Sequence, residues 1–184
     1  MAIFIILGIV VVIIIVLVSI FNSLVRLRNQ VKNAWAQIDV QLKRRHDLIP
    51  NLIETVKGYM VHERETLTKI TEARSAAMSA NTIAEKSQAE GVLGNLMGKL
   101  QVAVEAYPDL KANQNFMALQ EELTSTENKI SFSRQNYNDQ VLFYNNKIQM
   151  FPSNIVASMH NFKEAEFFEI KDETERAVPK VSFN

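Results

Sequence analysis

The chain has 184 residues, and its 20 basic and 20 acidic side chains leave no formal net charge. Balanced charge gives nucleic acid no electrostatic reason to bind, so we expect no nucleic-acid partner. Cysteine is absent, which excludes disulfides, thiolate metal sites and a lipid-modified cysteine. Only five glycines and four prolines occur, and this scarcity favours long helices over a turn-rich β fold.

The first predicted element is a transmembrane helix at residues 2–21, AIFIILGIVVVIIIVLVSIF. The segment carries no charge, and a helix of this length rises about 30 Å, the thickness of the hydrocarbon core of a bilayer. Its Ile and Val residues would favour a strand in water, but a lone strand in lipid leaves its backbone groups unpaired. A cleaved signal peptide is disfavoured, because no basic segment precedes the apolar run and no small-x-small site follows it. We therefore assign residues 1–22 to an anchor whose partner is the lipid bilayer.

Basic residues gather on the C-terminal side of this anchor. They are Arg26, Arg28, Lys32, Lys43, Arg44 and Arg45, whereas no Lys or Arg precedes the span. The positive-inside rule then predicts a single-pass plasma-membrane protein with its N-terminus outside and the following domain in the cytoplasm. Arg26 and Arg28 either flank the span as a stop-transfer signal, the interpretation we favour, or contact anionic headgroups.

A helical apolar stripe follows the anchor directly. Its members step by three or four and are Leu24, Leu27, Val31, Trp35, Ile38, Leu42, Ile49, Leu52 and Val56, with Arg45 in the single gap. This spacing predicts a long helix with a coiled-coil-like seam. Pro50 interrupts the pattern, so we expect either a kink near residues 47–50 or a second helix that begins at Pro50.

Two further helices are predicted in the middle of the chain. The first continues the helical spacing of apolar residues to about Ala80. Asn81 and Thr82 then form a break that includes a capping residue. The next covers residues 84–106, and a turn follows at residues 107–110. The predicted core face of this second helix consists of Val92, Leu93, Leu96, Leu100 and Val104.

The last long helix has the most regular pattern. Aromatic and aliphatic residues recur at seven-residue intervals: Phe116, Leu123, Ile130, Tyr137, Tyr144 and Phe151. Such heptads indicate a long helix packed at a shallow angle, ending at Phe151 before Pro152. The predicted fold is therefore all-α, with an N-terminal transmembrane helix followed by an antiparallel bundle of three to four long helices. We assign residues 23–152 to the bundle and residues 153–184 to a mostly extended tail with a possible short helix, its end at 177–183 being extended.

Three charged residues stand on otherwise apolar stripes, namely Arg45, Glu127 and Arg134. Each would be costly to bury alone, so we expect the three to pair or to reach water. A structural polar network that fixes helix register is favoured over a catalytic or ligand-binding cluster. One acid between two arginines supplies neither a general base nor a nucleophile.

The sequence contains no complete copy of a known catalytic or metal-binding motif. His62 and Glu63 resemble the start of a zinc-protease motif, but Thr66 stands where the second histidine belongs. No Walker loop, serine elbow or dinucleotide fingerprint occurs. We therefore predict no catalytic, cofactor-binding or metal-binding residue, no cofactor, no small-molecule substrate and no enzymatic activity.

Three ordered blocks of the sequence form a recognisable pattern. They are residues 33–63, from Asn33-Ala34-Trp35 to His62-Glu63; residues 107–112, YPDLKA; and residues 126–152, from Thr126-Glu127-Asn128-Lys129-Ile130 to Phe151-Pro152. In these blocks the sequence resembles the LemA family of bacterial membrane proteins. The resemblance covers nearly the whole chain. It implies a membrane-anchored bundle of long antiparallel helices at the cell envelope, and it offers no catalytic residues to carry over.

Together these features favour a membrane-anchored helical scaffold or protein-interaction module that binds a protein partner or a second copy of itself. Two alternatives stay open. One is a membrane-associated enzyme with an unrecognised site, which would need a cleft with convergent polar groups. The other is a sensor or adaptor in an envelope-stress or protease pathway.

Overall fold

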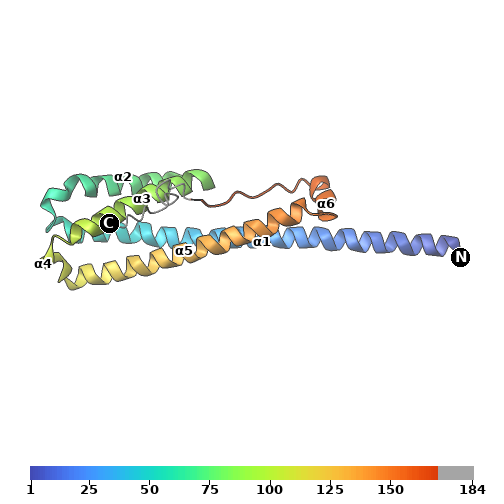
Figure 1. Cartoon of the computed structure of the whole chain (residues 1–184), viewed down its shortest axis with the longest axis horizontal. Helices are drawn as coiled ribbons and strands as arrows, with labels where there is room; N and C mark the ends of the chain where they lie inside the picture. The colour runs from blue at the N-terminus through green and yellow to red at the C-terminus, as the bar shows by residue number, and fades with distance from the viewer. Residues whose placement is uncertain (170–184) are drawn as a thin grey trace, which may run out of the picture. The chain divides into compact units, whose positions relative to one another are not determined.

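The computed structural model describes residues 1–169, and every regular element in that range is helical (Figure 1). The elements are α1 (Ala2–Lys57), the 3-10 turn η1 (Val61–Glu63), α2 (Arg64–Ser79), α3 (Ile83–Val104), α4 (Pro108–Lys111), α5 (Gln114–Gln149) and α6 (Ser153–Met159). The predicted all-α fold with an apolar N-terminal helix is confirmed. The extended stretch predicted at residues 177–183 lies outside the described residues.

The chain divides into two compact units. Unit 1 joins Met1–Val40 to Ile130–Phe167, and unit 2 joins Gln41–Lys129 to the chain from Phe168 onward. Helices α1 and α5 each contribute one end to each unit. Helix α1 therefore includes the apolar segment of unit 1 and also contributes residues 41–57 to unit 2.

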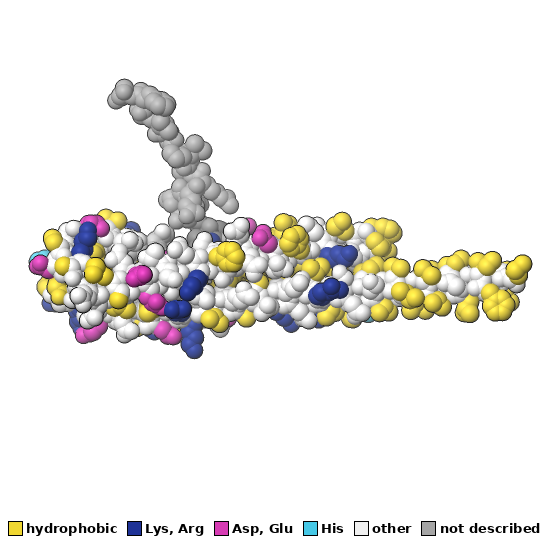
Figure 2. Space-filling model, turned by 90° about the horizontal axis from the view of Figure 1, so that it is seen from below, with side chains coloured by type: hydrophobic (Ala, Val, Ile, Leu, Met, Phe, Trp, Pro, Cys, Tyr) yellow, Lys and Arg dark blue, Asp and Glu magenta, His cyan; other side chains and the backbone are white. Residues whose placement is uncertain are grey.

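Unit 1 contains the membrane anchor. Hydrophobic side chains on the first part of α1 are exposed, as Ile3 and Phe4 show at 78% each, and Figure 2 shows this projecting helix covered by hydrophobic side chains. Among residues 1–169, α1 is the helix long and apolar enough to cross a membrane. The chain is thus a membrane protein, since so large an apolar surface requires lipid rather than water around it.

Further along unit 1, α1 and α5 pack through the predicted stripes. The rings of Trp35 and Tyr137 meet edge to face with centroids 5.4 Å apart. The heptad residues up to Tyr144, which is 2% exposed, are buried except for Leu123, which is partly buried. It is wrong for Phe151, which is 79% exposed, because α5 ends at Gln149 and the chain leaves the helical register there.

A segment after α6 returns along unit 1. Asn145 is buried and exchanges two hydrogen bonds with Ala165: its amide nitrogen donates to the Ala165 carbonyl at 2.9 Å, and its oxygen accepts from the Ala165 N–H at 2.9 Å. The Tyr137 hydroxyl donates to the Glu166 carbonyl at 2.8 Å. These bonds satisfy backbone groups that no regular element would pair.

Unit 2 packs the last part of α1, residues 41–57, against α2, α3, α4 and the first part of α5. Its core consists of Ile49, Leu52, Val56, Met60, Leu67, Ile70, Ala73, Ala77, Leu93, Leu100, Val104, Leu110 and Phe116. The predicted cap at Thr82 is present as a capping box, in which Thr82 and Glu85 each accept from the other's backbone N–H. One predicted core residue, Val92, is wrong, since its side chain is 50% exposed on the outer face of α3.

Pro50 lies inside α1, which runs unbroken to Lys57. The alternative of a second helix beginning at Pro50 is therefore wrong. The turn predicted at residues 107–110 forms the one-turn helix α4, with Pro108 in its first position, where a missing N–H costs nothing.

Candidate functional site

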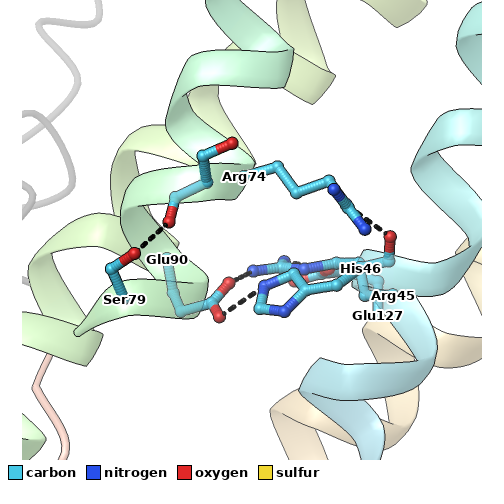
Figure 3. Close-up of polar contacts among 7 residues, drawn as sticks. Arg45, His46, Arg74, Ser79, Glu90 and Glu127 are labelled. Carbon is cyan, nitrogen blue, oxygen red and sulfur yellow. Dashed lines mark hydrogen bonds and ion pairs between the residues drawn. The ribbon is translucent and has the colours of Figure 1, made fainter. Parts of the chain in front are cut away.

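The most prominent polar feature of unit 2 is a buried group of charges. Arg45 and His46 are neighbours on α1, with 4% and 6% of their surfaces exposed, and both point toward Glu90 on α3 (Figure 3). Arg45 Nη2 pairs with Glu90 Oε2, and His46 Nε2 lies 2.9 Å from Glu90 Oε1. Each carboxylate oxygen of Glu90 therefore faces a different side chain of α1. We call Arg45, His46, Glu90 and Glu127 the Arg45 cluster.

Glu127 joins this cluster from α5. Its Oε2 accepts from Arg45 Nη1 at 2.7 Å, but 54% of the Glu127 side chain is exposed, against 2% for Glu90. Arg45 thus has one buried and one half-exposed acidic partner. The buried pair is the one whose loss would strand a charge away from water.

The structure brings together two of the three charges predicted to form a network. Arg45 and Glu127 pair directly, whereas Arg134 belongs to unit 1 on the later part of α5, so the three-residue network stays a prediction. The sequence did not predict that Glu90 and His46 belong to this network. Glu90 precedes Leu93 by three residues and so continues the apolar stripe of α3, the same signal that singled out Arg45.

The electrostatics of the cluster keep Glu90 ionised. Burial by itself raises the pKa of the Glu90 carboxyl, but the contact with His46 and the charge of Arg45 outweigh it and hold that pKa below its usual range. A carboxylate with a lowered pKa that is held by Arg45 is a weak proton acceptor. The arrangement favours holding three helices in register over acid–base chemistry.

Arg74 on α2 adds a contact that explains how Pro50 fits inside α1. Proline has no N–H, so the carbonyl four residues before Pro50, that of His46, loses its helical donor. Arg74 Nε donates to this carbonyl at 2.7 Å (Figure 3). The hydrogen bond from α2 replaces the missing one and ties α2 to the same turn of α1 that carries the Arg45 cluster.

An open groove of about 410 Å³ runs beside the cluster between α1, α3 and α5. Arg45 and Glu127 line it together with an apolar wall and a few amide and hydroxyl groups: Leu52, Gly94, Met97, Gly98, Leu100, Gln101, Val104, Phe116, Gln120, Leu123, Thr124 and Asn128. A Cβ added at Gly94 or Gly98 would meet nothing within 4 Å. An apolar wall with few charges suits binding of an apolar surface.

Within residues 1–169, no group of three or more His, Asp or Glu side chains is placed to hold a metal ion. His62, at the failed zinc-protease motif, lies in η1, away from the Arg45 cluster in sequence.

Comparison with known proteins places these features in a family context. The model of the LemA family matches residues 34–183, a range that includes the whole Arg45 cluster. Protein LemA of Metamycoplasma hominis is 30% identical over 154 residues, covering 82% of this chain and 69% of that protein. Magnetosome protein MamQ 2 of Paramagnetospirillum magneticum is 23% identical over 177 residues, covering 82% of this chain and 65% of that protein. Magnetosome protein MamQ of Magnetospirillum gryphiswaldense is 21% identical over 177 residues, again covering 82% of this chain and 65% of that protein. The chain spans about two thirds of the length of these relatives.

Proposed function

We propose, from the premise that this chain belongs to the LemA family, that it is a membrane-anchored interaction module that binds an apolar segment of another protein at the groove beside the Arg45 cluster. The module acts by binding and does no chemistry. The observation that carries the proposal is the continuity of α1, because one helix includes both the membrane anchor and one wall of the groove.

The character of the groove supports a protein ligand. Gly94 and Gly98 lie four residues apart on α3, so the backbone there is open to close approach by another chain. The polar groups on the rim, such as Gln101 and Asn128, can hydrogen-bond to a partner's backbone. An apolar wall with a polar rim is the usual anatomy of a protein–protein interface.

The contacts that the charged residues make argue against catalysis. Glu90, the buried acid, faces Arg45 and His46, and its lowered pKa makes it a poor base. Reactivity would require a group whose pKa is tuned toward the working pH and which faces a substrate. The cluster instead uses its charge to hold helices in place.

Topology completes the proposal. Lys and Arg side chains gather after the apolar segment, at Arg26, Arg28 and Lys32. By the positive-inside rule, the helical units then face the cytoplasm and the N-terminus lies outside the plasma membrane. The partner would accordingly be a cytoplasmic protein or the cytoplasmic part of a membrane protein.

Two glutamines on α3 provide a matched test, since the native chain has no cysteine. Gln101 lines the groove, whereas Gln88 is exposed on the same helix outside it. Single variants Gln101→Cys and Gln88→Cys, carrying a cleavable thiol-linked photocrosslinker, are irradiated in intact cells. The expected result is a discrete crosslinked protein from position 101 that position 88 does not give, and its loss when Gly94→Trp fills the groove.

The outcomes separate the alternatives. A crosslink to a second copy of the chain identifies the occupant as the protein itself and makes the module a self-assembling scaffold. Equal crosslinking from both positions, or crosslinking unaffected by Gly94→Trp, refutes the groove as the interface. A membrane-impermeant maleimide that labels Gln88→Cys in intact cells refutes the cytoplasmic orientation.

A further inference from the structure

The turn between α5 and α6 exposes an unusual density of large hydrophobic side chains. Met150, Phe151, Ile155 and Met159, which we call the apolar elbow, are 49–79% exposed, although they lie within ten residues of one another. Single exposed hydrophobic residues are ordinary on a protein surface, but a contiguous group of this kind marks an interaction site.

The exposure arises from the placement of hydrophobic residues on α6. Val156 and Ala157 are buried and form the inner face of this short helix. Ile155 and Met159, four residues apart, share the outer face of α6 and are exposed. Packing within the chain already uses the inner face, so the outer hydrophobic residues need another environment.

The position of the elbow relative to the anchor identifies that environment. Phe21, the last residue of the apolar segment, packs its ring edge to face against His160, with centroids 4.8 Å apart, and against Phe162 at 5.8 Å. Arg28 lies over the Phe162 ring, 5.0 Å from its centroid. The end of α6 is therefore held at the point where α1 leaves the membrane, and Figure 2 shows hydrophobic side chains gathered at the base of the projecting helix.

We propose that the apolar elbow is a second membrane contact, inserted into the headgroup and acyl-chain boundary of the same bilayer that α1 crosses. The proposal rests on α1 spanning that bilayer and is independent of the groove. Lipid is favoured as the occupant because His160, the residue after the elbow, packs against Phe21 at the end of the apolar segment of α1. Exposed hydrophobic side chains on one face of a short helix beside a membrane span are typical of interfacial insertion.

Charges close to the elbow match this placement. Arg26 follows Phe21 by five residues, which is about 7.5 Å along the helix, the depth of the headgroup layer. Its guanidinium and that of Arg28 can meet lipid phosphates while the elbow reaches below them. With contacts on both α1 and α6, unit 1 cannot rotate freely about the axis of its anchor.

The test measures depth directly, using single cysteines in the full chain reconstituted in vesicles of phosphatidylcholine and phosphatidylglycerol at 3:1. Nitroxide labels are placed by Phe151→Cys and Met159→Cys. Phe132→Cys is the matched control, because Phe132 is 74% exposed on α5, the helix that leads into the elbow, but lies about 26 Å along it from its end at Gln149. Ile13→Cys reports the anchor itself. The readouts are collision rates of each label with oxygen, which concentrates in lipid, and with a water-soluble nickel chelate.

The expected result is an oxygen-to-nickel ratio at residues 151 and 159 that is several-fold above the ratio at residue 132 and below the ratio at residue 13, which lies near the middle of the span. A low ratio at 151 and 159 with a high ratio at 13 overturns the elbow contact while leaving the anchor intact. A low ratio at residue 13 instead refutes the membrane span. Spin–spin broadening at residue 159 that disappears on dilution with unlabelled protein assigns the surface to a second copy and also overturns the proposal.

A charge substitution provides a second measurement. Ile155→Glu places a carboxylate on the outer face of α6 without touching the buried Val156. We expect the nickel collision rate at a label on residue 151 to rise several-fold, while the helical circular dichroism stays unchanged. An unchanged collision rate means that lipid does not surround the elbow.

Discussion

Replacing Arg74 should reveal how α1 tolerates its internal proline. The substitution Arg74→Met keeps an apolar stem of similar length but removes the guanidinium that donates to the His46 carbonyl. Because Pro50 cannot supply an N–H, that carbonyl then lacks both its helical donor and its replacement. The prediction is that the cost of Arg74→Met depends on the presence of Pro50.

The magnitude follows from the type of hydrogen bond. A hydrogen bond to a charged donor contributes about 1.5–3 kcal/mol, and partial exposure of Arg74 places this one near the lower end, at about 1.5–2 kcal/mol. In a Pro50→Ala background, the Ala N–H bonds to the His46 carbonyl, so the cost of Arg74→Met should fall below about 0.5 kcal/mol. The expected coupling of about 1–1.5 kcal/mol exceeds the error of about 0.3–0.5 kcal/mol for independent sites.

The assay is urea unfolding of the full chain in detergent micelles, monitored by circular dichroism at 222 nm. It is run on the native chain, both single variants and the double variant. Hydrogen exchange of peptides from α2 gives an independent reading, since loss of the tether to α1 should speed exchange there about tenfold for each 1.4 kcal/mol. The exchange measurement also covers the case in which the two units unfold in separate steps.

Additive effects would refute this account. If Arg74→Met costs the same amount with Ala as with Pro at position 50, the guanidinium does not replace the missing helical donor. Pro50→Ala should also stabilise the chain on its own, by up to about 3 kcal/mol from helix propensity. A destabilising Pro50→Ala would mean that the proline is needed for the path of α1.

Further predictions concern single substitutions, and each is checked by urea or pH titration of the full chain. Glu90→Gln should lower the free energy of unfolding by about 3–5 kcal/mol, because it leaves the buried Arg45 guanidinium without its buried partner. Glu127→Gln should lower it by under about 1 kcal/mol, since the Glu127 side chain is half exposed. Equal losses would contradict this difference between the two acidic partners of Arg45. The lowered pKa of Glu90 also means that its contribution to stability is complete above pH 4.5 and is lost as the pH falls through the folded-state pKa; Glu90→Gln should remove this acid dependence. Gly98→Ala should stabilise by about 0.5–1 kcal/mol, because the added methyl group meets open space, and Thr82→Ala should cost about 1 kcal/mol through loss of the α3 cap; effects of the opposite sign refute either reading. Burial raises the pKa of Tyr137 from 10.0 to about 12, so its stabilisation is complete below pH 10 and lost as the pH rises toward 12, and Tyr137→Phe should abolish this alkaline loss.

Local signals in the sequence were sufficient for most of the helices. The uncharged run at residues 2–21, the three-or-four spacing after Leu24 and the heptads from Phe116 to Tyr144 each report the period of a helix and the face that it buries. The break with a capping residue at Asn81 and Thr82 also followed from residue type, because a helix cap is made within a single turn. These features depend on neighbours close in sequence.

The errors came from competition between local and distant interactions. Phe151 continues the heptad in sequence but lies beyond the end of α5, so its side chain is exposed and joins the apolar elbow. Val92 sits among core residues on α3 yet faces outward, because only the neighbours of a helix decide how wide its buried face is.

The sequence alone determined the membrane anchor, the helical period of each long segment and the presence of an isolated charge, Arg45, on an apolar stripe. Only the tertiary structure decided that Glu90 on α3 is the buried acid that meets this charge, and that Arg74 on α2 accommodates Pro50. The physical reason is distance along the chain: period and hydrophobicity are encoded within a few turns, whereas the partner of a buried charge or orphaned carbonyl comes from another helix, 45 or 28 residues away.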